Sequence, residues 1–224
     1  MLEIYLDTAD LAQIQRLHPI LTLRGVTTNP SILAQGGIGV NAVLAELSQL
    51  MGADARFHVQ VLSHRLDDIL SEARQLQGLP YDIVVKIPAH AAGLAAIKVL
   101  KREGIPILAT AIYNPQQGML AALNGADYLA PYLNRIDNLG FTGMSVVSDL
   151  QQFIVSQELS CQLLVASFKN VQQVLEVIRL GVGAITLPAE IAWQMLDTPM
   201  TDRAVTQFTT DWQAKFGDCP SFAS

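Results

Sequence analysis

The feature that most constrains the fold is an eightfold repetition of one pattern, a short β-rich run followed by a helical pattern. The β-rich runs lie at 2–8, 23–29, 56–62, 81–88, 106–112, 127–135, 161–168 and 184–189. Helical spacing of apolar residues follows at 9–17, 40–51, 64–76, 91–103, 114–124, 144–157, 170–181 and from Glu190 onwards. Several runs are continuously apolar, which is typical of parallel strands covered on both faces.

Eight such units in a chain of this length predict an α/β fold, a (β/α)8 or TIM barrel. The alternative is a doubly wound open sheet. The nucleotide-binding form of that alternative is disfavoured, because no GxGxxG sequence follows the first run.

A ninth helical pattern, 201–217, follows the eight units, with Val205, Phe208, Trp212 and Phe216 on one face. We expect this apolar face to pack against another protein surface, which is either the chain's own barrel or a neighbouring subunit, and we favour the neighbouring subunit. The predicted organisation is therefore a barrel domain at 1–200 and a C-terminal helix and tail at 201–224, packing on another subunit.

Composition excludes several classes of protein. Half of the 224 residues are hydrophobic, 15% are charged, and the net charge is −6, which suits a large core and disfavours a nucleic-acid partner. We find neither a signal peptide nor an apolar run of about 20 residues, and therefore expect a cytoplasmic protein with no membrane partner. Cys161 and Cys219 are expected to be unrelated reduced thiols, and neither they nor the four histidines have the spacing of a metal site.

Polar residues interrupt the apolar runs near their C-terminal ends. In a barrel these ends meet at one face and build the active site, although strand ends in general become more polar as they approach solvent. The residues concerned are Asp7, Thr27, Thr28, Asn29, Gln60, Lys86, Thr110, Tyr132, Asn134, Arg135, Ser167 and Lys169.

Lys86 is the most informative of these residues, because it alone among five lysines lies within an apolar strand, DIVVKIP. Burial disfavours the ammonium form and lowers the pKa, and a neutral amine can form a Schiff base with a ketone. The resulting iminium is an electron sink that lets a neighbouring carbon–carbon bond break or form. The alternative is a lysine paired structurally with Asp7 or another carboxylate.

Two further features indicate function less specifically than Lys86 does. Arg135 and Ser167 are a candidate phosphate site, since a guanidinium fork and a hydroxyl suit that anion. His58 alternates with Gln60 and is expected to point the same way, whereas Gly181-Val182-Gly183 precedes the last strand and is interpreted as a helix end and turn.

Several stretches together resemble the transaldolase family, and most closely its small fructose-6-phosphate aldolase branch. They are IYLDTAD (4–10), GVTTNPSI (25–32), DIVVKIP (82–88), GLAAIKVLKREGIP (93–106), APYLNRID (130–137), VASFK (165–169) and ITLP (185–188). The resemblance runs from the first strand to about Trp212. GVTTNPS and the lysine strand are highly specific when both occur in this order.

The resemblance implies a role for each matching residue. Lys86 matches the Schiff-base lysine, and Asp7 matches an aspartate near the hydroxyl-bearing carbons of the substrate. Asn29 matches the asparagine that contacts the donor. The other matches are Gln60, Thr110 and Tyr132, which hold a catalytic water and transfer protons, Arg135 and Ser167, which bind phosphate, and Thr27 and Thr28, which are similar to wall residues.

Two positions discriminate within the family. Transaldolases have glutamate where this chain has Gln60 and phenylalanine where it has Tyr132, whereas the aldolase branch has glutamine and tyrosine. A tyrosine hydroxyl can donate and accept a proton beside the iminium, which phenylalanine cannot. The resemblance thus implies a class I aldolase, a lyase that reversibly cleaves fructose 6-phosphate to dihydroxyacetone and glyceraldehyde 3-phosphate.

The resemblance also implies that no metal or organic cofactor is needed, and that the chain forms a homo-oligomer, often a decamer of stacked pentamers. The alternatives are a transaldolase that transfers the dihydroxyacetone unit, a non-catalytic sugar-phosphate-binding barrel, and a barrel in which Lys86 binds pyridoxal phosphate.

Overall fold

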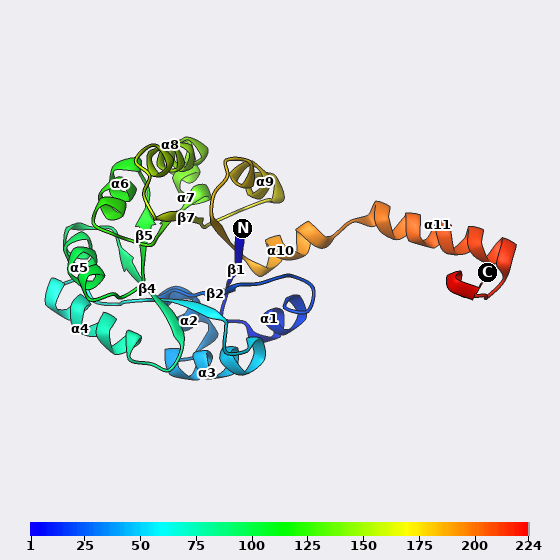
Figure 1. Cartoon of the computed structure of the whole chain (residues 1–224), viewed down its shortest axis with the longest axis horizontal. Helices are drawn as coiled ribbons and strands as arrows, with labels where there is room; N and C mark the ends of the chain where they lie inside the picture. Colours follow the sequence, from blue (N-terminus) through cyan, green and yellow to red (C-terminus); the bar gives the residue numbers. More distant parts are fainter. Residues whose placement is uncertain (224) are drawn as a thin grey trace.

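The chain folds into a closed barrel of eight parallel strands surrounded by helices, with one long helix outside (Figure 1). The computed structural model describes residues 1–223. The strands are β1 (Glu3–Asp7), β2 (Gly25–Thr27), β3 (Arg56–Gln60), β4 (Asp82–Pro88), β5 (Ile107–Ile112), β6 (Tyr128–Pro131), β7 (Gln162–Val165) and β8 (Ala184–Leu187). Each strand pairs with its neighbours in chain order and β8 pairs with β1, so the predicted (β/α)8 barrel is confirmed.

Ten helices cover or adjoin the barrel in the described part of the chain. They are α1 (Leu11–Leu17), α2 (Pro30–Gly36), α3 (Val40–Met51), α4 (Leu66–Gln77), α5 (Ala91–Arg102), α6 (Pro115–Leu123), α7 (Leu133–Asn138), α8 (Gly143–Ser156), α9 (Val171–Arg179) and α10 (Ala189–Leu196). Two connections carry an additional short helix, α2 after β2 and α7 after β6. Both short helices begin beside the strand ends that the sequence marks as polar.

Apolar side chains separate into two clusters because strand residues alternate between the two faces of the barrel wall. The larger cluster lies between strands and helices and includes Leu6, Ile83, Val85 and Ile87. The smaller fills the barrel interior and consists of Tyr5, Val84, Leu108, Tyr128, Ala130, Leu164 and Ala184. Lys86 is two residues beyond Val84, so it belongs to the next interior tier towards the C-terminal ends of the strands.

Strands 2 and 6 are shorter than predicted. β2 ends at Thr27, and the side chain of Asn29 caps α2 by accepting a hydrogen bond from the Ile32 amide at 3.0 Å. β6 ends at Pro131, and α7 begins at Leu133, because Leu133 and Ile136 bury one helical face at i, i+3 spacing. The prediction that Asn134 and Arg135 belong to a strand is therefore wrong, since both lie on α7.

Helix α11 (Pro199–Phe216) extends away from the barrel, as Figure 1 shows. Met200, Val205, Phe208 and Phe216 are exposed, whereas the Trp212 indole donates a hydrogen bond to the carbonyl of Cys219 at 2.7 Å. Ser224, the last residue of the predicted 201–224 segment, lies outside the described residues. Cys161 and Cys219 are both free thiols, and within residues 1–223 no helix combines the length and apolarity that crossing a membrane requires.

Candidate active site

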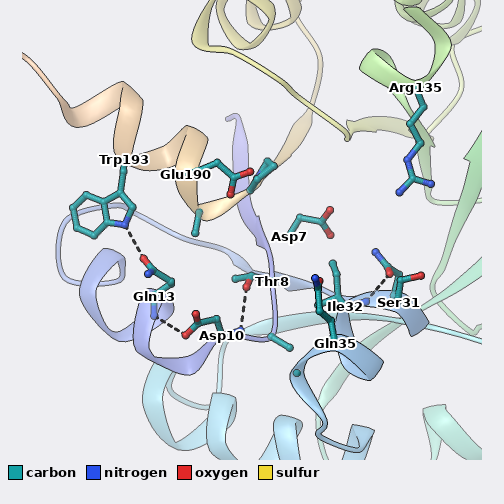
Figure 2. Close-up of a pocket in the computed structure, with 15 residues that line it drawn as sticks. Asp7, Thr8, Asp10, Gln13, Ser31, Ile32, Gln35, Arg135, Glu190 and Trp193 are labelled. Atoms are coloured by element: carbon teal, nitrogen blue, oxygen red, sulfur yellow. Dashed lines mark hydrogen bonds between the residues drawn. The ribbon is translucent and has the colours of Figure 1, made fainter. Parts of the chain in front are cut away.

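A cavity of about 370 Å³ opens at the C-terminal ends of the strands. Of the residues selected from the sequence, it is lined by Asp7, Asn29, Lys86, Tyr132, Asn134, Arg135, Ser167 and Lys169. A second cavity of about 920 Å³ shares Asp7, Asn29 and Arg135 with the first and continues outward over α1, α2 and α10. Figure 2 shows Asp7 and Arg135 facing this outer space from β1 and α7.

Lys86 projects from β4 into the inner cavity, and its residue is only 4% exposed. Its Nζ donates a hydrogen bond to the carbonyl oxygen of Thr28 at 2.6 Å, and no carboxylate in the described chain forms a salt bridge with it. Burial lowers the pKa of the amine below its ordinary 10.5; the charge of Asp7 opposes this shift and that of Arg135 reinforces it. The structural pairing with a carboxylate, left open by the sequence, is not observed.

Asp7 is held by a chain of hydroxyl groups. The Thr27 hydroxyl donates to Asp7 Oδ1 at 2.7 Å and also lies 2.7 Å from the Thr186 hydroxyl. A hydroxyl has one proton, so Thr186 must donate to Thr27 when Thr27 donates to Asp7. This relay from β8 through β2 to β1 orients a carboxylate at the cavity wall, where it can accept a proton.

Tyr132 is held by β5. Its hydroxyl lies 2.9 Å from the hydroxyl of Thr110, the residue before Ala111. Ala111 has a φ of 55° at the point where the β5–β6 register shifts, and this left-handed conformation is uncommon for a residue other than glycine. Burial raises the pKa of the Tyr132 hydroxyl, so Tyr132 remains a proton donor well above neutral pH.

The predicted phosphate residues also adjoin Tyr132. The Arg135 guanidinium lies over the Tyr132 ring, 4.7 Å from its centroid, and Arg135 itself is exposed. Ser167 follows β7 with a φ of 67°, and its carbonyl accepts a hydrogen bond from the Asn134 amide at 3.0 Å. Lys169 lines the same cavity, so two cations and one hydroxyl surround a space that suits an anion.

Four selected residues do not line the inner cavity. Thr27 donates a hydrogen bond to Asp7, the Thr110 hydroxyl lies beside that of Tyr132, and the Thr28 carbonyl accepts the hydrogen bond from Lys86. Gln60 is paired with Lys86 across the β3–β4 ladder, but its side chain makes no hydrogen bond within residues 1–223. The water-holding role of Gln60 stays a prediction.

The structure adds three residues that sequence reasoning missed: Ala111, Thr186 and Glu190. Thr186 interrupts the apolar run Ile185–Leu187 and could have been found by the criterion that selected Gln60. Ala111 could not, because its contribution is a backbone conformation that a single alanine does not signal. Across residues 1–223, no three His, Cys, Asp or Glu side chains are grouped so that they could hold a metal ion.

The fold and the site define the class of protein: a (β/α)8 barrel with a buried lysine, an oriented carboxylate and a half-buried tyrosine at the C-terminal ends of its strands. A model of the transaldolase/fructose-6-phosphate aldolase family matches residues 4–219. The chain belongs to this family.

Among solved structures, the chain is similar to a mandelate oxidase mutant with the monooxide FMN adduct, with 12% sequence identity and a TM-score of 0.57. The match covers 86% of this chain and 65% of that chain. At this identity the similarity concerns the barrel fold alone.

Proposed function

We propose that the protein is a class I aldolase that reversibly cleaves fructose 6-phosphate to dihydroxyacetone and glyceraldehyde 3-phosphate. The observation that carries the proposal is Lys86, a buried amine in a cavity, with a carbonyl but no carboxylate as its partner. A lysine in this position has a depressed pKa and is nucleophilic. Membership of the transaldolase/fructose-6-phosphate aldolase family supports chemistry of this type.

The reaction begins when neutral Lys86 attacks the ketone carbon, and loss of water from the carbinolamine leaves an iminium. Asp7 then removes the proton of the hydroxyl on C4, the C3–C4 bond breaks, and its electrons move into the iminium. The products are glyceraldehyde 3-phosphate and an enamine on Lys86. Tyr132, directly or through a water held by Gln60 and Thr110, protonates the enamine, and hydrolysis releases dihydroxyacetone. The reaction uses no cofactor.

Two features favour aldolase over transaldolase chemistry. Tyr132 lines the cavity and its hydroxyl lies 2.9 Å from that of Thr110, so it can deliver the proton that releases the donor as free dihydroxyacetone. A transaldolase keeps the enamine until an aldose phosphate accepts it. The glutamine at position 60 agrees with the aldolase branch that the sequence resembles.

We further propose that Arg135 and Ser167 bind the substrate phosphate and that Asn29 contacts the donor portion. Asn29 lines both cavities; its side-chain oxygen is occupied in capping α2, whereas its amide nitrogen has no partner within the described chain. Thr27 and Thr28 support the site from its wall.

The test is borohydride reduction in the presence of fructose 6-phosphate or dihydroxyacetone. The protein mass should increase by one reduced donor unit, and peptide mapping should place the addition on Lys86. An unchanged mass would support a non-catalytic sugar-phosphate-binding barrel. A yellow protein with near-ultraviolet absorbance would indicate bound pyridoxal phosphate instead.

A second measurement separates aldolase from transaldolase. Fructose 6-phosphate is supplied with and without erythrose 4-phosphate, and glyceraldehyde 3-phosphate is measured with a coupled dehydrogenase. We expect product in both reactions. Product formed only with the acceptor would identify a transaldolase.

We also propose that the protein is a cytoplasmic homo-oligomer, a decamer of stacked pentamers as the family resemblance implies, in which residues 201–224 reach a neighbour beyond the 1–200 barrel. The exposed Val205, Phe208 and Phe216 on an extended helix support this assembly. Light scattering of the full chain and of a Phe208→Glu variant tests it, since the variant should form smaller particles. Equal particle sizes would oppose this role for the helix.

A further inference from the structure

His58 is a buried titratable residue that the proposed reaction does not use. It lies on β3, has 0% exposure, and is paired with Val84, one interior tier below the pair formed by Gln60 and Lys86. Val84 belongs to the interior cluster of the barrel, and three other members of that cluster, Leu108, Ala130 and Leu164, line the Lys86 cavity. Leu108, Ala130 and Leu164 therefore form the floor of the active-site cavity, and His58 lies in the packed interior beneath that floor.

Two tyrosines pack against the imidazole of His58. The rings of Tyr5 and Tyr128 meet it edge to face, with centroid distances of 4.7 Å and 5.2 Å. Their hydroxyl groups donate to Glu3 Oε2 at 2.8 Å and 3.0 Å, at the N-terminal end of the barrel. The aromatic carbon thus surrounds His58, while the hydroxyls and the carboxylate are kept at the opposite end from Lys86.

His58 is held in the neutral state. Neither ring nitrogen has a hydrogen-bond partner in the described structure. Burial lowers the pKa of the imidazole well below its ordinary value, and the positive charges of Lys86, Arg56 and Arg24 lower it further. A positive charge on the ring would be repelled by the positive charges of Lys86, Arg56 and Arg24.

His58 also contacts the lysine pocket through the backbone. The carbonyl of His58 accepts hydrogen bonds from the amide and the hydroxyl of Thr28, at 3.0 Å and 3.2 Å. The carbonyl of Thr28 in turn accepts the hydrogen bond from Lys86 Nζ. The residue beneath the floor therefore also fixes the only polar group that the amine contacts by a hydrogen bond in the described structure.

We propose that His58 is a positioning residue for Lys86: it fills the barrel interior beneath the cavity floor with a neutral, close-packed ring that excludes water and counter-ions from beneath the amine. The inference rests on the proposed Schiff-base function and extends it to a residue that touches neither substrate nor reacting atoms. Without this ring, water would reach the amine from below and stabilise the ammonium form, which is not nucleophilic.

The groups that set the charge of Lys86 come from several elements. Asp7 on β1 favours the ammonium form and Arg135 on α7 disfavours it; Tyr132, Lys169 and Glu190 line the same cavity. Tyr5 and Tyr128 contact the His58 ring, and the charges of Lys86, Arg56 and Arg24 act on it. Within residues 1–223, no carboxylate forms a hydrogen bond or salt bridge with the imidazole, so its replacement by a neutral side chain changes solvation without removing a counter-ion.

The experiment measures the Lys86 pKa directly, without substrate. Wild type, His58→Ala and His58→Phe are trace-labelled with acetic anhydride across a pH series, and acetylation of the Lys86 peptide is quantified by mass spectrometry. Exposed Lys98 on α5 serves as an internal control in each sample. His58→Ala should raise the Lys86 pKa by about 1 unit because its small side chain opens the floor to water.

His58→Phe is the matched control, because it keeps a neutral ring and removes two unpartnered nitrogens. It should leave the Lys86 pKa within about 0.3 unit of the wild-type value and should raise the melting temperature. If either variant does not fold, His58→Thr replaces the alanine and His58→Leu replaces the phenylalanine.

An unchanged or lower Lys86 pKa in His58→Ala would overturn the proposal. A rise of the Lys86 pKa in His58→Phe equal to that in His58→Ala would also overturn it, because a neutral ring at position 58 would then not be enough to keep the pKa low. The labelling needs no catalysis, so it decides the role of His58 even if no ketose adduct forms on Lys86 and the proposed function fails.

Discussion

The two ends of the barrel interior contain similar kinds of side chain but arrange them in opposite ways. At the N-terminal end, the charged and hydroxyl groups bind one another: Arg56 donates to Asp82 at 2.9 Å and to the Tyr128 hydroxyl at 3.0 Å, and Glu3 accepts from both tyrosines. At the C-terminal end, Lys86 has no ion-pair partner in residues 1–223 and faces a cavity.

The comparison shows how one barrel separates stability from chemistry. A satisfied polar network rigidifies a core, whereas an unpaired buried amine destabilises the folded chain and becomes reactive. The intervening tier of Tyr5, His58 and Tyr128 keeps the two ends apart. Substitutions at the C-terminal end of the barrel should therefore change activity, and those at the N-terminal end should change stability.

The largest expected effect is that of Lys86→Met, which keeps the length of the side chain and removes the amine. Aldol cleavage should fall by at least about 10³-fold because no iminium can form. Borohydride with substrate should leave the mass of this variant unchanged. Residual cleavage close to the wild-type rate would remove Lys86 from the mechanism.

The same variant has a stability effect with a defined sign. The Lys86 pKa is lowered in the folded state, so between that pKa and about 10.5 the unfolded chain binds more protons and wild-type stability rises with pH. Lys86→Met should raise the free energy of unfolding at pH 7 by about 1–3 kcal/mol, and the gain should shrink as pH approaches 10.5. Urea denaturation at pH 7 and pH 10 measures it.

Tyr132→Phe should have the next largest effect. Cleavage should decrease by about 10²- to 10⁴-fold because the proton donor for the enamine is lost, while adduct formation on Lys86 persists. Steady-state kinetics and borohydride trapping together test this separation. Unchanged cleavage would exclude Tyr132 from proton transfer.

Thr27→Val tests the relay that orients Asp7. The variant removes the hydroxyl that bonds both Asp7 and Thr186, so kcat should fall about tenfold, equivalent to about 1.4 kcal/mol. Thr27→Ser keeps the hydroxyl and is the control. Equal losses in the two variants would assign the effect to packing of the methyl group.

The smallest effect on activity is expected for a substitution at the N-terminal end of the barrel. Arg56→Met breaks the bonds to Asp82 and Tyr128 and should lower the free energy of unfolding by about 2 kcal/mol, with kcat within about twofold of wild type. Urea denaturation and steady-state assays of one preparation measure both quantities. A large loss of activity in a folded Arg56→Met protein would contradict the separation of the two ends.

The repeated units and the lysine strand were readable from the sequence because each is a local pattern. Apolar runs followed by helical spacing predict a barrel, and an apolar strand with one lysine predicts a buried amine. The helix after β6 was not predicted, since DYLAPYLNR has strand-like apolar residues and its helical turn is stabilised by burial of Leu133 and Ile136 in the folded barrel.

By itself, the sequence determined the order of the strands and most of the polar side chains that lie at or just beyond their C-terminal ends, because hydrophobic periodicity is a property of neighbouring residues. Only the tertiary structure decided that Lys86 contacts a carbonyl rather than a carboxylate, that Thr186 completes the Asp7 relay, and that His58 lies beneath the amine. These arrangements join residues from β1, β2, β3, β4 and β8, whose proximity arises from closure of the barrel and has no signature in any single segment.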